Sequence, residues 1–302
     1  MNKFTSHVSP GIGLATLGVI IASVGFGFVP VFARSLTEAG MAPHAVALYR
    51  YVLAVLVLMP VVWRWRHERG PLLWGLFVGL AMGLGWVGYV SALRVVPVST
   101  AGVLYMTYPV FTLILSWGLF GDKPTVRGTI GALMIVVAAA VVASPAAIDP
   151  AQIPALLLSL TAPAGFGLGI AVLVHKLTSI PALARIGIVS AGSVIGLLPL
   201  VLTTAPAALM PVDGKGWLMV LGIGLGTALI PQLLYTVCSP MIGTARTAMA
   251  GSVELPVMFA LGWLFFGEAL HPAQGAALVL VLAAILITPG RRARSIAATL
   301  RR

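Results

Sequence analysis

Charged residues are scarce in this chain, and acidic ones are the scarcest. Only 8% of its 302 residues are charged, and seven of these are Asp or Glu. A soluble domain carries about a quarter charged residues, so this chain lacks the polar surface that water on all sides requires. A single cysteine, Cys238, leaves no partner for an internal disulfide. These shortages exclude a soluble globular protein and a disulfide-stabilised one.

Long apolar segments take the place of the missing charge. The sequence is 60% hydrophobic, with a mean hydropathy of +1.07. Its apolar segments of roughly twenty residues are each long enough to cross a hydrocarbon core of ~30 Å as a helix. They lack the alternation of lipid-facing strands, which excludes a barrel. We therefore predict an all-α polytopic membrane protein with ten transmembrane helices, at residues 11–33, 44–63, 71–93, 98–120, 127–145, 153–174, 182–203, 216–237, 242–266 and 272–290.

The net charge of +11 is distributed unevenly between the two predicted sides of the membrane. With ten spans and a cytoplasmic N-terminus, fourteen of the eighteen Lys and Arg residues fall in cytoplasmic loops or tails or near the cytoplasmic ends of spans. This is the positive-inside pattern, and it predicts that both termini are cytoplasmic. The basic tail 291–302 is expected to lie against anionic lipids of the inner leaflet. A role in binding nucleic acid is the less favoured alternative, because basic tails after a last span are common.

Two stretches of the sequence match each other at an offset of 146 residues. The first is TYPVFTLILSWGLFGD (107–122), and the second is VELPVMFALGWLFFGE (253–268). The shared WxxFG[D/E] ends with Asp122 in one copy and Glu268 in the other. Because five predicted spans precede Asp149 and five follow it, the second half enters the membrane inverted relative to the first. The sequence therefore predicts two inverted five-helix repeats, 11–145 and 153–290.

The two matching regions resemble the EamA type of the drug/metabolite transporter superfamily. The resemblance is carried by ALRVVPVSTAGVLYMTYPVFTLILSWGLFGDKPTVRGTIGALMIV (92–136) and by SPMIGTARTAMAGSVELPVMFALGWLFFGEALHPAQGAALVLV (239–281). Pro109 and Gly131 fit the pattern of such a unit. Two departures are the separation of Glu254 from Pro256 by one residue and the Asp at position 122. The resemblance implies ten helices, with the fifth and tenth packed outside the pathway, and a role in exporting small metabolites.

Glu254 is an acid inside a run that is otherwise apolar or small. It lies about ten residues into the predicted span 242–266, hence ~15 Å deep and close to the midplane. A carboxylate that faced lipid there would cost several kcal/mol, so we expect Glu254 to face a polar cavity. Desolvation favours the neutral form of a carboxyl, which makes Glu254 a candidate for substrate binding and proton coupling. The alternative is a buried structural acid.

Six further residues are candidates for the same pocket. Aromatic and polar residues at helical spacing share one face of three predicted spans. The offset of 146 relates candidates from the first half of the chain to candidates from the second half. The candidates from the first half are aromatic, and their counterparts from the second half are mainly polar. We predict a midplane pocket that binds a planar or cationic group, unless these rings only form a belt at the membrane interface. The six are Trp86, Tyr89, Tyr105, Tyr108, Gln232 and Tyr235.

Three other charged residues fall at or near the ends of predicted spans. Arg50 lies ~9 Å into its helix. It could snorkel outward, which we favour, pair with Glu254, or bind an anionic group of the substrate. Asp122 and Glu268 are expected to stabilise the N-terminal dipoles of the helices that follow them.

The predicted function is transport of small metabolites, such as amino acids or related amphipathic solutes, across a bacterial inner membrane. The direction of export comes from the resemblance. An intramembrane enzyme and a lipid flippase are the alternatives, but the sequence has no HExxH metal motif and no Walker loop. We expect no cofactor and no metal, a small-molecule substrate, and a monomer or weak homodimer.

Overall fold

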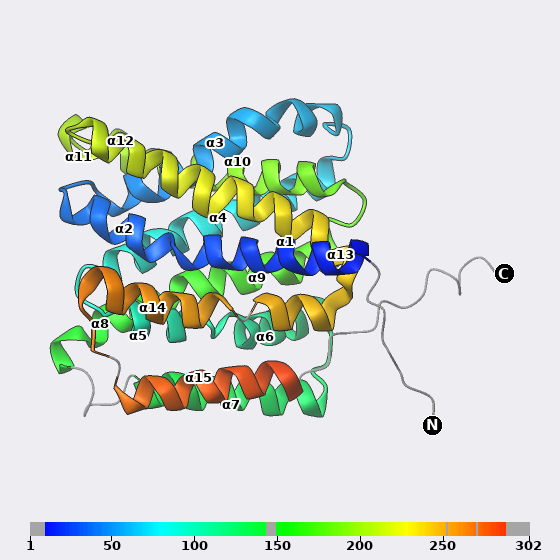
Figure 1. Ribbon diagram of the computed structural model, residues 1–302. Coiled ribbons are helices and arrows are strands. Elements are labelled where there is room, and N and C mark those ends of the chain that lie inside the picture. The colour runs from blue at the N-terminus through cyan, green and yellow to red at the C-terminus, as the bar shows by residue number, and fades with distance from the viewer. Residues whose placement is uncertain (1–9, 143–148, 252, 270, 288–302) are drawn as a thin grey trace, which may run out of the picture.

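The fold is built from helices that lie roughly side by side (Figure 1). The computed structural model describes residues 10–142, 149–251, 253–269 and 271–287, and every regular element among them is a helix. Helices satisfy their own backbone hydrogen bonds, which lipid cannot do. Before residue 143 these are α1 (Pro10–Gly27), α2 (Val29–Glu38), α3 (Pro43–Arg64), α4 (Arg69–Ala92), α5 (Val98–Tyr105), α6 (Tyr108–Phe120) and α7 (Val126–Val142).

The helices after residue 148 are more often interrupted. One of them, η2, is a π-helix that follows α12 directly and leads into α13. The predicted tail 291–302 lies outside the described residues. The helices are η1 (Pro150–Gln152), α8 (Ile153–Ser159), α9 (Thr161–His175), α10 (Ala182–Leu202), α11 (Pro206–Leu209), α12 (Gly214–Leu221), η2 (Gly222–Leu229), α13 (Ile230–Gly251), α14 (Glu254–Phe266) and α15 (Pro272–Ile287).

The described helices make this a multi-pass membrane protein. Seven stretches are long and apolar enough to cross a membrane, and each corresponds to one of the ten predicted spans. The other three spans are represented by the shorter apolar helices α7, α14 and α15. The all-α polytopic class predicted from the sequence is confirmed.

Two predicted spans differ from the observed helices in an informative way. Span 98–120 is divided into α5 and α6, and span 242–266 is divided between α13 and α14. A proline ring clashes with the carbonyl four residues earlier, and the helices α5 and α13 end near this position before Pro109 and Pro256, respectively. The predicted break at 238–243, by contrast, is not marked by a loop, since α13 is helical throughout.

Helices α6 and α14 have the same length and the same ends at the offset of 146. Each has 13 residues and ends at a left-handed glycine, Gly121 at φ +71° and Gly267 at φ +63°. The amide of Asp122 donates to the Ser116 carbonyl, as that of Glu268 does to the equivalent carbonyl of Gly262. The WxxFG[D/E] sequence therefore encodes a helix C-terminus that only glycine closes without strain.

The most extensive contacts between the two parts of the chain join α1 to α13, α10 to α3 and α4, and α7 to α15. The approach of α4 to α10 depends on glycines. A Cβ at Gly192 would collide with the backbone of Leu76, and one at Gly79 would collide with that of Val189. The Ser193 hydroxyl, next along α10, donates to the Gly79 carbonyl at 2.8 Å. Small residues thus allow backbone contact where lipid supplies no hydrophobic driving force.

Replacing Gly192 by alanine should therefore lower the thermal stability of the protein in detergent. The added methyl meets backbone atoms that cannot rotate away, and such overpacking costs about 1–3 kcal/mol. Gly118→Ala on α6 is the matched control, because a Cβ there meets nothing within 4 Å. An equal melting temperature for the Gly192 and Gly118 variants would contradict the tight contact of α4 with α10.

Candidate functional site

Five aromatic rings meet inside the bundle where α4, α5, α6 and α9 approach one another. The Tyr105 ring is at the centre, with its centroid 5.7 Å from Trp86, 5.8 Å from Tyr89, 6.0 Å from Tyr108 and 6.0 Å from Phe166. Trp86, Tyr89 and Tyr105 are at most 6% exposed. Contacts between aromatic rings at such distances contribute beyond their buried area. The structure thus brings together four of the eight predicted site residues.

Arg50 adds a buried cation to this aromatic cluster. Its guanidinium carbon lies 3.6 Å from the centroid of the Trp86 ring, and the residue is 9% exposed. Among the described residues, no group accepts a hydrogen bond from its Nε or Nη1, and the Tyr89 hydroxyl is also without a partner. The preference for snorkelling was wrong, because Arg50 points into the bundle. A desolvated cation–π contact contributes roughly 2 kcal/mol or more, but two donors remain for a ligand.

Glu254 is the first residue of α14, as Tyr108 is the first residue of α6. Its carboxylate is close enough to Arg50, Tyr89 and Tyr105 to interact with them electrostatically. It forms no ion pair with Arg50 and no hydrogen bond with a side chain that the structure describes. The helix break thus places an acid beside the aromatic cluster.

Tyr235 and Gln232 lie on α13 and are half-buried. The Tyr235 ring meets Phe26 of α1 edge-on at 6.1 Å, and its hydroxyl is near the charge of Glu254. Gln232 forms no hydrogen bond with any described residue. Tyr235 therefore joins the Glu254 side of the site.

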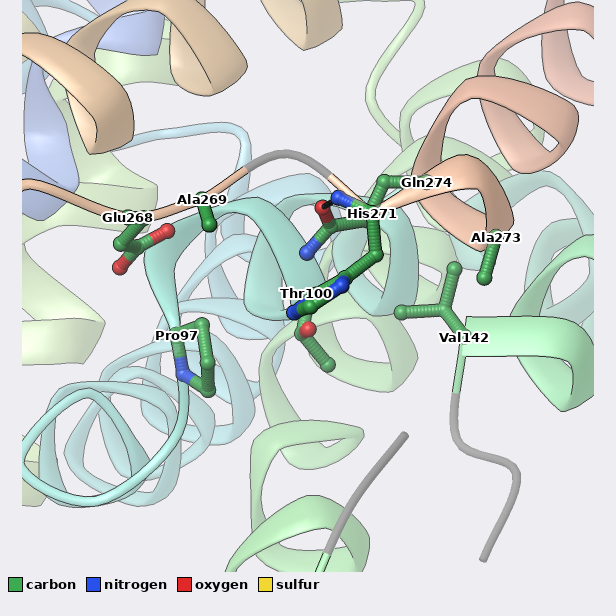
Figure 2. A pocket seen from close by; sticks show the side chains of 8 residues that line it. All are labelled: Pro97, Thr100, Val142, Glu268, Ala269, His271, Ala273 and Gln274. Atoms are coloured by element: carbon green, nitrogen blue, oxygen red, sulfur yellow. Dashed lines mark hydrogen bonds between the residues drawn. The ribbon is translucent and has the colours of Figure 1, made fainter. Parts of the chain in front are cut away.

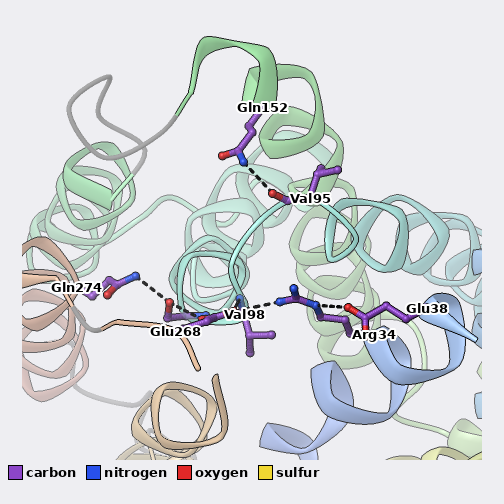
Figure 3. A network of polar contacts seen from close by, with 8 residues as sticks. Arg34, Glu38, Val95, Val98, Gln152, Glu268 and Gln274 are labelled. Carbon is purple, nitrogen blue, oxygen red and sulfur yellow. Dashed lines mark hydrogen bonds and ion pairs between the residues drawn. The ribbon is translucent and has the colours of Figure 1, made fainter. Parts of the chain in front are cut away.

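The sequence predicted that Glu268 stabilises the helix that follows it, and this prediction was wrong. Its carboxylate accepts hydrogen bonds from the amides of Val98 and Ser99 at 2.6 and 3.1 Å and from the Ser99 hydroxyl at 2.9 Å. These amides begin α5, 170 residues away along the chain, and Arg34 completes the group (Figure 3). Glu268 lies four residues before α15, but its carboxylate accepts hydrogen bonds from the first amides of α5. It therefore caps α5 and not α15.

Two cavities lie outside the aromatic cluster. One, of about 160 Å³, is lined by Glu268, His271 and Gln274 and by neighbouring small residues (Figure 2). The other, of about 430 Å³, lies between α4, α6 and α9 and is lined by apolar residues and Thr161. None of the eight predicted residues lines either cavity.

Two aromatic residues of the site were not predicted from the sequence. Phe166 meets the Tyr108 ring edge-on at 5.0 Å, and Phe26 contacts Tyr235. Both belong to the GFG sequences at 25–27 and 165–167. These sequences were the available signal, because each places its ring against a tyrosine from the other part of the chain.

Comparison with known proteins supports the assignment made from the sequence. Residues 13–144 match the model of the EamA-like transporter family. No curated protein matches the chain. A solved crystal structure whose description names no function aligns with 91% of this chain and 96% of its own, at a TM-score of 0.61 and 20% identity. At that identity the likeness shows the fold alone. The resemblance to EamA-type transporters is therefore confirmed by the family match of residues 13–144.

Proposed function

We propose that this protein is a secondary transporter that exports small metabolites, such as amino acids or related amphipathic solutes, by alternating access. Its substrate site is the aromatic cluster with Arg50 and Glu254. The observation that carries the proposal is the pair of opposite charges inside the bundle. Among the described residues, Arg50 has two donor nitrogens without an acceptor, and Glu254 forms no ion pair. Buried charges that are not paired with each other are costly and mark substrate or ion pathways in membrane proteins.

The two charges suit a substrate that carries both an anionic and a cationic group. Arg50 offers its Nε and Nη1 donors to a carboxylate, while Glu254 accepts from an ammonium. The rings of Trp86 and Tyr105 lie between α3 and α6 and offer flat faces to an apolar or cationic part. A proton on Glu254 in the empty site would replace the substrate cation, which couples transport to protons.

The two halves, 11–145 and 153–290, would provide the alternation. Support comes from α6 and α14, which begin and end 146 residues apart and carry Tyr108 and Glu254 at their first positions. Ten transmembrane helices in two inverted repeats, with both termini in the cytoplasm of a bacterium, complete the proposed architecture. The protein would act as a monomer or weak homodimer in the inner membrane, its tail 291–302 on anionic lipid.

Metabolite profiling of the growth medium tests this function against its two alternatives. Cells that overexpress the protein should release one or a few amino acids or related solutes faster than cells that carry the empty vector. An intramembrane enzyme would create a compound absent from the control, and a lipid flippase would leave soluble metabolites unchanged. Either outcome would replace the proposed function. The double variant Arg50→Met, Glu254→Gln is the control, because it is overexpressed in the same way but lacks both charges of the proposed substrate site.

A further inference from the structure

Arg34, on α2, forms an ion pair with a residue from the other half of the chain. Its Nη1 lies 3.3 Å from Oε1 of Glu268, and its guanidinium carbon lies 4.4 Å from the centroid of the Phe266 ring. Arg34 also binds Glu38, one turn further along α2, at 2.9 Å. We refer to Arg34, Glu268 and Phe266 as the Arg34 contact.

His175, the last residue of α9, forms a similar group. Its Nε2 lies 2.9 Å from Oδ2 of Asp122, and its ring stacks on Phe120 with 4.4 Å between centroids and 8° between planes. Its Nδ1 lies 2.8 Å from the Ala171 carbonyl. Both ring nitrogens thus lie within hydrogen-bonding distance of an oxygen atom. We refer to His175, Asp122 and Phe120 as the His175 contact.

The phenyl rings and the acids of the two contacts are related by the offset of 146. Phe120 and Phe266, like Asp122 and Glu268, are 146 positions apart. In one contact the basic residue comes from residues 11–145 and the acid from 153–290, and in the other this is reversed. Each contact therefore ties one half of the chain to the other through a basic residue, a phenyl ring and an acid.

The contacts lie at opposite ends of the bundle. Glu268 binds the first residues of α5, while Asp122 follows the last residue of α6. Together α5 and α6 form one span of 23 residues, which is ~35 Å at 1.5 Å per residue. The aromatic cluster lies between, because Tyr105 and Tyr108 flank the junction of α5 with α6.

We propose that the Arg34 contact and the His175 contact are the two gates of the transport pathway, one at each end. This inference rests on the proposed function: a pathway that alternates between two sides must release one contact between the halves while it keeps the other. In this structure both contacts are formed, which agrees with the packed aromatic cluster. Their side chains are 10–30% exposed, so each pair can be hydrated when it opens, unlike Arg50.

Thiol labelling from each side of the membrane tests the proposal. The background carries Cys238→Ala, and Thr107→Cys places one thiol at the junction of α5 with α6, where Thr107 is 6% exposed. A membrane-impermeant maleimide is applied to right-side-out and inside-out vesicles. Arg34→Gln should speed labelling from one side, and His175→Gln should speed it from the opposite side. We expect about five- to tenfold in each case, which is the lower part of the usual range of a coupling between sites.

Control variants separate gating from a general loss of structure. Arg94→Gln and His67→Gln remove the same residue types from exposed positions. Neither should change labelling by more than about twofold, since ion pairs at the surface contribute little. Arg34→Lys and His175→Arg keep a cation and should restore slow labelling. If Arg34→Gln is poorly inserted, Arg34→Met keeps the side chain over Phe266 and replaces it in the comparison.

The directions of labelling decide the outcome. Faster labelling from opposite sides supports the two gates. Faster labelling from the same side, or no difference from the Arg94 and His67 controls, overturns them. The assay needs no substrate, so it is independent of transport: opposite labelling in a protein that exchanges no solute would refute the proposed function and leave the gates in place.

Discussion

Replacing Glu254 by glutamine should abolish the pH dependence of transport and lower its maximal rate by about tenfold or more, the equivalent of ~1.4 kcal/mol. The amide keeps the size and polarity of the side chain but cannot take up or release a proton. Because Glu254 has no described partner that would lose a contact, the variant should fold and insert normally. Transport driven by an imposed pH gradient in reconstituted vesicles measures the effect.

Two variants serve as controls for the Glu254 prediction. Glu254→Asp keeps the charge at a shorter reach and should retain part of the activity and its pH dependence. Tyr108→Phe, at the equivalent position of the other half, should alter affinity more than coupling, because a phenol with an ordinary pKa near 10 does not titrate around neutral pH. A Glu254→Gln protein with the rate and pH profile of the unmodified protein would exclude proton coupling through this residue. A variant that fails to fold would favour a structural acid.

Replacing Arg50 by methionine should weaken the binding of carboxylate-bearing substrates by about 10- to 100-fold, since hydrogen bonds to charged groups contribute ~1.5–3 kcal/mol. Methionine keeps an apolar chain of similar length over Trp86, so the aromatic cluster should stay packed. Arg50→Lys keeps the charge but loses the planar arrangement of donors. Its affinity for the substrate should fall between those of the unmodified protein and of Arg50→Met. Competition uptake with matched solutes, one with a free carboxylate and one with its amide, measures the difference.

A loss of affinity for both solutes of the pair would contradict a role for Arg50 in recognising a carboxylate. In that case the guanidinium would act through its stacking on Trp86, and Arg50→Met would impair every substrate equally. A loss of thermal stability in the Arg50→Met variant alone would point to the same conclusion. The comparison between Arg50→Met and Arg50→Lys separates charge from packing.

The class of protein was readable from the sequence because composition and segment length are set by the lipid that surrounds the chain. The offset of 146 correctly paired α6 with α14, since both copies encode the same glycine-closed helix end. It also placed Glu254 opposite Tyr108. The divided spans were harder to predict. Pro109 and Pro256 were visible in the sequence, but apolar residues continue on both sides of each, and hydropathy does not respond to a broken helix.

The partners of charged residues were the main features that the sequence could not provide. Glu268 binds amides 170 residues away, whereas the sequence predicted that it would stabilise the nearer helix α15. Arg50 lies near a helix end, and its position in the sequence favoured a side chain that extends to the membrane surface. In the structure it stacks instead on Trp86 of α4. His175 pairs with Asp122, which comes from the other half of the chain. Such contacts depend on how helices pack, which local spacing does not encode.

Counterflow exchange in reconstituted vesicles is the most direct test of alternating access with this protein. Vesicles that contain the purified protein are loaded with an unlabelled amino acid or related solute found in the medium profile, and a trace of the labelled solute is added outside. A carrier with one site that faces each side in turn should accumulate the label transiently above its equilibrium level, and Arg50→Met with Glu254→Gln should abolish this overshoot. Equilibration without an overshoot, or label recovered as a different compound, would contradict alternating access.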